Sequence, residues 1–264
     1  MPSDALIVAR NVCKSVSAGQ EILTILDDIS LAIHRGERFA IVGASGSGKT
    51  TLLGLLAGLD TPDSGAIHLC EHNLCYLNED QRAALRKEHV GFVFQSFLLV
   101  PTLTALENVM VGRHIRTRSG LIGAVLRLSS FREEEAAIAR RAQELLDYVG
   151  IGKFADYKAR TLSYGDQRRL EIARALATDP TLLALDEPAA GMNPRETEDL
   201  QALMEKVRSS GVTLLLIEHD VKLIMGLCDR VAVLDFGELI AEGVPAEVQS
   251  HPRVIEAYLG TGAA

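Results

Sequence analysis

Hydrophobic and polar residues follow two different patterns along this chain, and each pattern predicts a type of structure. Up to residue 42, polar turns separate short apolar runs of β type at 6–8, 22–26, 29–33 and 38–42. We expect the first three runs to form an antiparallel flank that leads into the fourth. Later in the chain strand and helix patterns alternate, with strands at 66–69, 90–95, 182–185, 212–217 and 231–234 and a helix at 194–209. Alternating β and α patterns predict an α/β fold with a mostly parallel sheet.

The middle of the chain has a different character. Residues 104–150 have few β-branched runs and many Ala, Glu, Arg and Leu residues, and residues 131–149 follow the period of an amphipathic helix. We therefore expect a helical subdomain inserted into the α/β core.

Composition and charge exclude several classes of protein. The 264 residues are 47% hydrophobic and carry a net charge of −8, so no basic surface indicates nucleic-acid binding. The four cysteines show neither zinc-ligand spacing nor a C-x-x-C pair, which favours free thiols in a reducing compartment. The first residues lack the pattern of a secretory signal, and no apolar run approaches the roughly eighteen residues that span a bilayer. We expect a soluble chain that reaches a membrane only through a partner.

The most informative motif is a glycine-rich loop at residues 43–50. It fits the pattern G-x-x-x-x-G-K-[ST] with Gly43, Ala44, Ser45, Gly46, Ser47, Gly48, Lys49 and Thr50, and Thr51 follows. An apolar strand precedes this phosphate loop and a helix pattern, ending at Gly58, follows it. Such a loop aims backbone N–H groups at one small volume, which suits a di- or triphosphate. Lys49 is expected to reach the terminal phosphates, and the Thr50 hydroxyl to bind Mg²⁺.

A second motif ends an apolar strand with two acids. The run 182–185 precedes Asp186 and Glu187, and a buried parallel strand delivers such residues to the carboxyl edge of its sheet, where ligands bind. Asp186 is expected to hold Mg²⁺ through water, and Glu187 to orient or deprotonate the attacking water. The alternative is an acidic helix cap after a core strand, which is less favoured beside a phosphate loop.

A third motif predicts another anion site. Ser163 suits a helix N-cap, and the residues after Tyr164 have strong helical periodicity. A chain with two phosphate-type sites suggests that two copies enclose shared nucleotides, each copy supplying half of each site.

Together these motifs resemble the ATP-binding subunit of an ABC transporter over nearly the whole chain. The loop at 43–50 matches the Walker A motif, Asp186 and Glu187 match the Walker B aspartate and catalytic glutamate, and residues 190–193 match the D-loop. Gln95 matches the Q-loop glutamine that contacts Mg²⁺, and His219 the switch histidine that contacts the γ-phosphate. Ser163, Tyr164, Gly165 and Asp166 lie in the signature (Leu162–Gln167), which contacts the ATP of the other copy.

This resemblance implies an organisation and a set of partners. The expected layout is a single P-loop NTPase domain, with its core and β flank at 1–96 and 166–243, a helical subdomain at 97–165 and a helical tail at 244–264. It implies ATP and Mg²⁺ as cofactors, a homodimer or a pair with a related ATPase subunit, and integral membrane permease subunits. The chain is then cytoplasmic and peripheral on the inner face of the plasma membrane, with no nucleic-acid partner and no direct membrane insertion.

Three positions depart from the family pattern. Val16 stands where an aromatic residue commonly stacks on adenine, so base recognition is expected to be weaker. Asp166 replaces the usual glutamine or glutamate of the signature, and we expect its carboxylate to face away from the γ-phosphate. Asn193 replaces the common aspartate of the D-loop, which is expected to soften coupling between the two ATP sites.

The two parts of the chain resemble different subfamilies. Residues 1 to about 108 are similar to ATPases of lipoprotein release and macrolide export, and the rest to ATPases that import branched-chain amino acids. This mixture predicts a recombined or engineered chain with a junction near residues 106–112, and a natural intermediate lineage is the alternative. The favoured substrate class is branched-chain amino acids, and the alternatives are an export-type ATPase or a chimeric ATPase without a cognate permease.

Two further hypotheses belong to other classes. A soluble ABC-type ATPase acting on ribosomes or DNA usually has two cassettes or a coiled-coil insertion, neither of which this acidic, single-cassette sequence has. A folded scaffold without useful turnover is the other hypothesis, given Val16, Asp166 and Asn193.

Overall fold

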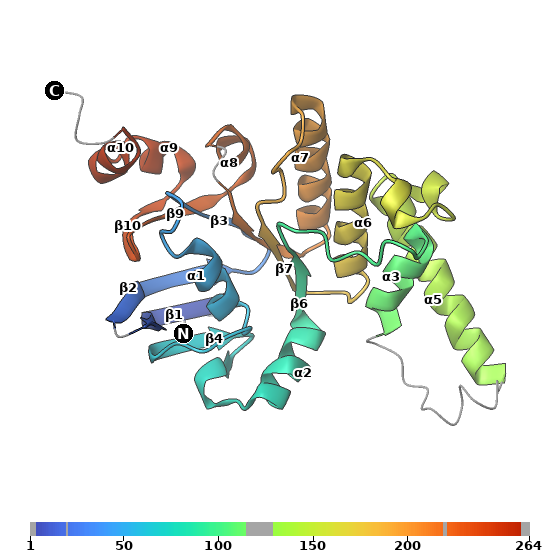
Figure 1. Ribbon diagram of the computed structural model, residues 1–264, viewed down its shortest axis with the longest axis horizontal. Coiled ribbons are helices and arrows are strands. Elements are labelled where there is room, and N and C mark those ends of the chain that lie inside the picture. The colour runs from blue at the N-terminus through green and yellow to red at the C-terminus, as the bar shows by residue number, and fades with distance from the viewer. Residues whose placement is uncertain (1–3, 20, 115–128, 219–220, 260–264) are drawn as a thin grey trace.

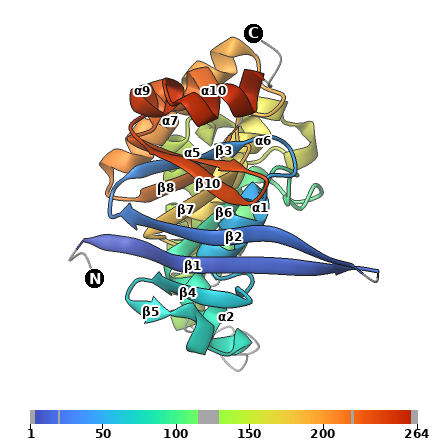
Figure 2. The ribbon, with the colours of Figure 1, turned by 90° about the vertical axis from the view of Figure 1, so that its left-hand side faces the viewer.

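The computed structural model describes residues 4–19, 21–114, 129–218 and 221–259. Within this part the chain forms two sheets, with strand orders β2-β1-β4-β5 and β10-β9-β3-β8-β7-β6. Figure 2 shows the long antiparallel strands β1 and β2 between the larger sheet and the short strands β4 and β5. The predicted α/β core with an antiparallel β flank is confirmed.

The antiparallel sheet is built on two long strands. β1 (Ala5–Ala18) pairs with β2 (Glu21–His34), and β4 (Ser64–Leu69) and β5 (His72–Asn73) extend the sheet. The prediction of two separate runs in residues 22–33 was wrong, because β2 is one continuous strand. Its pairing with β1 contains register shifts, and Asp28 has a φ of 52°. This irregularity lets Leu26 and Ile29 both reach the core while the polar residues between them remain in one strand.

The larger sheet is parallel except at one edge. It contains β3 (Arg38–Gly43), β6 (Val90–Val93), β7 (Leu182–Asp186), β8 (Thr213–Ile217), β9 (Arg230–Asp235) and β10 (Glu238–Gly243), of which only β10 runs antiparallel to its neighbour. Alternate side chains of β3 enter two separate hydrophobic cores: Phe39 and Ile41 enter one, and Ala40 and Val42 enter the other. Both faces of the sheet are thus covered, which explains the unbroken apolar runs in the sequence.

Helices cover the sheet and also form a separate group beside it. α1 (Lys49–Leu56) lies between the two sheets, and α2 (Glu79–His89) precedes β6. Figure 1 shows α3 (Ala105–His114), α5 (Ser129–Tyr148) and α6 (Tyr164–Leu176) together, on the side of β6 and β7 away from the antiparallel sheet. The remaining helices are α7 (Pro194–Ser209), α8 (Val221–Leu227), α9 (Pro245–Gln249) and α10 (Pro252–Leu259). Among the described residues, no helix is long and apolar enough to cross a membrane.

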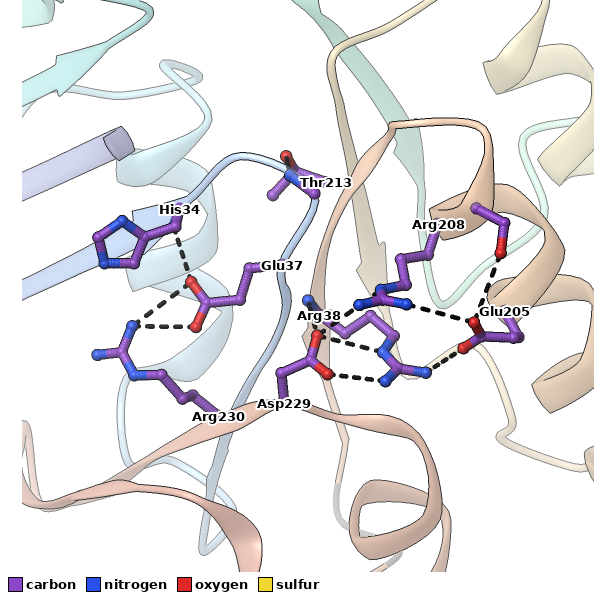
Figure 3. A network of polar contacts seen from close by, with 10 residues as sticks. His34, Glu37, Arg38, Glu205, Arg208, Thr213, Asp229 and Arg230 are labelled. Carbon is purple, nitrogen blue, oxygen red and sulfur yellow. Dashed lines mark hydrogen bonds and ion pairs between the residues drawn. The ribbon is translucent and has the colours of Figure 1, made fainter. Parts of the chain in front are cut away.

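A network of ion pairs secures the amino-terminal edge of the parallel strands (Figure 3). Arg38, the first residue of β3, pairs with Asp229 at 2.7 Å and with Glu205 of α7. Arg230, the first residue of β9, pairs with Glu37 at 3.0 Å, and Glu37 accepts a hydrogen bond from the His34 backbone. The network joins both sheets to α7 at the edge opposite the phosphate loop.

This network has a consequence for stability against pH. Burial alone raises the pKa of Asp229, but hydrogen bonds from Arg38 and its charge outweigh burial and hold that pKa below its usual value. A carboxylate whose pKa is lower in the folded than in the unfolded chain stabilises the fold above its unfolded pKa of about 4. That stabilisation is lost as the pH falls through the folded pKa.

We therefore expect Asp229→Asn to lower the free energy of unfolding by roughly 1–2 kcal/mol at pH 7. The difference in the free energy of unfolding between the variant and wild type should narrow below about pH 4, because the Asp229 carboxylate of wild type is then protonated and loses its charge. Urea titrations between pH 7 and pH 3 measure both effects. The exposed Asp156 supplies the control Asp156→Asn, and a difference that is equally large at pH 7 and pH 3 would contradict the assignment.

Candidate functional site

The sequence motifs meet at the carboxyl edge of the parallel sheet. The register places Ile217 beside both Ile41 of β3 and Asp186 of β7, and Val93 of β6 lies beside Leu185. The phosphate loop follows β3, the acidic pair ends β7, and Gln95 follows β6. Since parallel strands end at the same edge, residues from three distant parts of the sequence share one site.

The phosphate loop has a shape that requires glycine at two positions. Gly43 has a φ of 153°, and a Cβ there would lie 2.1 Å from the carbonyl oxygen of Leu234. Gly48 has a φ of 95°, and a Cβ there would lie 2.7 Å from the carbonyl oxygen of Ile25. The loop is thus enclosed by β9 on one side and by β2 on the other. Ala44, Ser45 and Gly46 form its exposed outer turn.

The loop fits a phosphate group. Gly48 is the N-cap of α1 and no side chain caps this helix, so its first N–H groups, from Lys49, Thr50 and Thr51, have no intrahelical partner. The buried Ser47 hydroxyl also has no hydrogen-bond partner among the described residues. Unpaired donors at a helix N-terminus form an anion-binding site.

Lys49 supplies the positive charge of this site. Its ammonium group donates to the carbonyl oxygens of Gly43 at 3.0 Å and Ala44 at 2.7 Å, so it lies across the loop. Burial lowers the pKa of Lys49, and the charges of Glu187 and Asp186 act in the opposite direction. A cation held against unpaired N–H groups can bind the outer oxygens of a di- or triphosphate.

Two carboxylates face this cation. Asp186 is 8% exposed, and burial, followed by the neighbouring charge of Glu187, raises its pKa. Glu187 has the left-handed φ of 47°, a strained conformation for a residue other than glycine, and its backbone N–H donates to Ile217 O at 2.9 Å. Its carboxylate accepts a hydrogen bond of 2.8 Å from the side-chain amide of Gln95.

Oxygen atoms of Asp186 and Thr50 fit a magnesium ion. Within the described ranges, no group of three or more His, Cys, Asp or Glu side chains could hold a metal by itself. Mg²⁺ commonly takes only one or two protein carboxylates and completes its shell with water and substrate phosphates. Asp186 and the exposed Thr50 provide ligands of that kind.

The signature lies at a different place. Ser163 caps α6 by accepting from the backbone N–H of Asp166, as predicted for this helix start. Tyr164 packs its ring against Phe97 at 4.8 Å, and a Cβ on Gly165 would lie 2.9 Å from Glu196 of α7. Among the described residues, no hydrogen bond or ion pair joins the signature to the phosphate loop of the same chain.

The Asp166 carboxylate accepts a hydrogen bond of 2.7 Å from the Ser163 hydroxyl. That it faces away from the γ-phosphate stays a prediction. The short aspartate side chain turns back over the helix N-terminus, where the helix dipole favours its charge. The hydroxyl that was expected to meet a phosphate is therefore engaged by a neighbouring carboxylate.

Two other departures from the family pattern have a clear local setting. Val16 is 43% exposed on β1, opposite Leu23 of the β1–β2 hairpin whose Ile25 touches Gly48. Asn193 caps α7 in a capping box with Glu196, each side chain accepting from the other's backbone N–H. An aspartate could perform the same capping, so capping alone does not explain the asparagine. His219 lies outside the described residues.

Several buried charged residues near the site were not predicted. Glu218 is 1% exposed and accepts from the backbone N–H of Ala189, just after the acidic pair. Arg168 and Glu171 form a buried ion pair at 2.9 Å on α6. A charged residue between apolar neighbours, such as Glu171 between Leu170 and Ile172, is the pattern that could have indicated burial. The pattern does not show which groups such a buried charge bonds.

Comparisons with known proteins agree with this geometry. Residues 26–190 match the family model described as "ABC transporter", and residues 238–264 match the one described as "Branched-chain amino acid ATP-binding cassette transporter". The chain is 40% identical over 239 residues to the high-affinity branched-chain amino acid transport ATP-binding protein LivG of Salmonella typhimurium, covering 90% of this chain and 92% of LivG. It is 41% identical over 244 residues to the uncharacterized ABC transporter ATP-binding protein YbbA of Escherichia coli, covering 92% of this chain and all of YbbA.

Solved structures of ATP-binding cassettes have a similar fold. The dimeric post-hydrolysis state of the ATP-binding cassette MJ0796 bound to ADP and Pi has a TM-score of 0.78 at 33% identity, covering 90% of this chain and 98% of that one. The ADP conformation of the cassette MJ1267 has a TM-score of 0.81 at 28% identity, covering 97% and 99%.

We expect Lys49→Ala to weaken ATP and ADP binding about 10- to 100-fold, because one charge-assisted contact to the phosphates is lost. Isothermal titration of the purified chain measures the affinity. Lys87→Ala, an exposed position on α2, is the matched control and should leave the affinity unchanged. Equal affinities of wild type and Lys49→Ala would remove Lys49 from the site.

Proposed function

Because the chain belongs to the ABC transporter family of ATP-binding proteins, we propose that it hydrolyses Mg·ATP between two copies to drive branched-chain amino acid import. The transport itself takes place through integral membrane permease subunits. The observation that carries the ATPase mechanism is the convergence of the phosphate loop, Asp186, Glu187 and Gln95 at one sheet edge. This arrangement combines a phosphate-binding site, a cation site and a carboxylate held by an amide.

Each group has a separate task in this mechanism. The N–H groups of the loop and the Lys49 ammonium hold and neutralise the phosphates, while Asp186 and Thr50 hold the metal side of the nucleotide. Charge compensation at the phosphates would come from Mg²⁺ held by Asp186 and Thr50. Glu187 orients or deprotonates the attacking water, and the Gln95 amide fixes the direction of its carboxylate. His219 is proposed for the γ-phosphate contact that the family resemblance implies.

The proposed dimer is head-to-tail. Ser163, Tyr164, Gly165 and Asp166 form a helix N-terminus that packs on the segment after Gln95 and on α7, away from the chain's own phosphate loop. A second copy can supply its signature to that loop. The similar cassette MJ0796, dimeric with ADP and Pi bound, supports a dimer. Ser163 must then release Asp166 before it can donate to a phosphate.

The proposed substrate rests on similarity in two parts of the chain. The LivG similarity extends over most of the length, and the match at residues 238–264 concerns the C-terminal part. An export-type ATPase is the second candidate, because residues 89–108 resemble ATPases of lipoprotein release and macrolide export. In either case we propose a cytoplasmic protein held at the inner face of the plasma membrane by its permease.

A recombined origin remains part of the proposal. The junction near residues 106–112 falls inside α3, where a Cβ on Gly112 would lie 2.4 Å from the carbonyl oxygen of Arg174 in α6. The two parts pair directly elsewhere, since β6 of the first part lies beside β7 of the second, which is compatible with ATP hydrolysis in a chain of either origin. Co-purification with the permease of a branched-chain amino acid importer, or with none, separates the importer from a chimera without a partner.

We expect Glu187→Gln to lower the turnover number at least 100-fold, since the amide cannot accept a proton from water. ATP binding should persist, because the phosphate loop is unchanged, and ATP should convert the variant to a stable dimer. Phosphate release and size-exclusion chromatography with and without ATP measure the two effects.

The exposed Glu144→Gln on α5 is the matched control for this experiment. It should hydrolyse ATP at the wild-type rate. Wild-type turnover in Glu187→Gln would refute the proposed role of Glu187.

A further inference from the structure

A fully buried arginine connects the signature helix to the segment that carries Gln95. Arg168 of α6 has no exposed surface, and its guanidinium donates to the carbonyl oxygens of Phe94 at 2.6 Å and Gln95 at 3.1 Å. The same group pairs with Glu171 at 2.9 Å. One side chain therefore donates hydrogen bonds to two successive backbone carbonyl groups, one of which belongs to Gln95.

Further contacts hold the rest of this segment, residues 94–98, against α6. Glu171 is 2% exposed and accepts from the backbone N–H of Leu98 at 2.8 Å. The ring of Phe97 contacts the Arg168 guanidinium, 4.8 Å from its centroid, and also the ring of Tyr164. The segment cannot shift relative to α6 without breaking several of these contacts.

The other end of the connection is the proposed catalytic carboxylate. The backbone carbonyl of Gln95 is bound by Arg168, and its side-chain amide donates to Glu187 at 2.8 Å. The position of Glu187 is thereby tied to α6 through a single intervening residue.

The choice of an arginine agrees with a geometric role. A buried ion pair is weak evidence for stability, because apolar residues of similar volume often stabilise a protein equally well. The planar guanidinium can bond a carboxylate and two carbonyl oxygens at fixed directions, whereas a lysine ammonium is a point charge that lacks this fork.

We propose that Arg168 is a positioning residue, which holds the Gln95 backbone so that the Gln95 amide keeps Glu187 oriented for hydrolysis. This inference rests on the proposed function of Glu187. It makes the Glu187 carboxylate sensitive to movement of α6, the helix that begins at the signature. Arg168 itself bonds the backbone of Gln95 and not its side chain.

Arg168→Lys tests the proposal while keeping a cation against Glu171, so that the fold is retained. We expect the turnover number to fall about tenfold, because a small misplacement of reacting groups has effects of that size or larger. The KM for ATP should change less than about twofold, since the phosphate loop does not touch Arg168. Thermal unfolding of each variant records any loss of stability separately.

A double-mutant cycle with Gln95→Ala distinguishes positioning from a general structural role. If Arg168 acts through Gln95, Arg168→Lys lowers the turnover number in the wild-type background and has no further effect in Gln95→Ala. Arg113→Lys is the matched control, because Arg113 also bonds a backbone carbonyl and a carboxylate, those of Ala177 and Asp179, away from this segment. It should leave the turnover number unchanged in both backgrounds.

Three outcomes would overturn the inference. These are an equal loss from Arg168→Lys with and without Gln95, no loss in either background, or a rise in KM that accounts for the loss. Unchanged turnover in Glu187→Gln would overturn the proposed function and this inference with it. If Glu187→Gln is inactive and any of the three outcomes for Arg168→Lys is found, the role of Arg168 is overturned and the proposed function stands.

Discussion

The register of the parallel strands is the constraint on which the site depends. Hydrogen bonds align Ile41, Ile217 and Asp186 in one row, with Val93 beside the residue before Asp186. A slip of one residue would exchange the two buried faces of a strand and move its terminal side chain away from the others. Because both faces are packed against separate cores, such a slip is strongly disfavoured. Lys49, Asp186, Glu187 and Gln95 can therefore meet although they come from distant parts of the sequence.

The same edge underlies the proposal that one chain holds only part of each nucleotide site. Its own loop, carboxylates and amide converge, whereas its signature packs against residues 94–98 and α7. Arg168 joins these two regions inside the chain, since it lies in the signature helix and bonds the Gln95 backbone. In the proposed dimer, each signature would serve the partner's nucleotide while remaining attached to the catalytic side of its own chain. The contacts of Arg168 also cross the proposed junction near residues 106–112, so the two parts of the chain form one structure.

The fold and the phosphate site were largely predictable because their determinants are local. The helix at 194–209 was located at its observed bounds, and the loop at 43–50 follows a pattern that only glycine can satisfy at Gly43 and Gly48. The β2 strand was divided wrongly because Asp27 and Asp28 resemble a turn until the pairing with β1 is known. The hydrogen bond from Ser163 to Asp166 depends on a side-chain conformation, and that from Arg168 to Gln95 spans 73 residues. Neither can be read from local patterns of hydrophobic and polar residues.

The central claim, that two copies share each ATP site, is tested most directly by mixing two inactive variants. Lys49→Ala impairs phosphate binding by the loop but leaves the signature intact. Ser163→Glu places a negative charge in the signature, which repels the phosphate, but leaves the loop intact. In an equimolar mixture half of the dimers contain both variants, and each of these has one complete site. The account predicts that the mixture recovers about a quarter of wild-type ATP hydrolysis. A mixture no more active than its two components would contradict it.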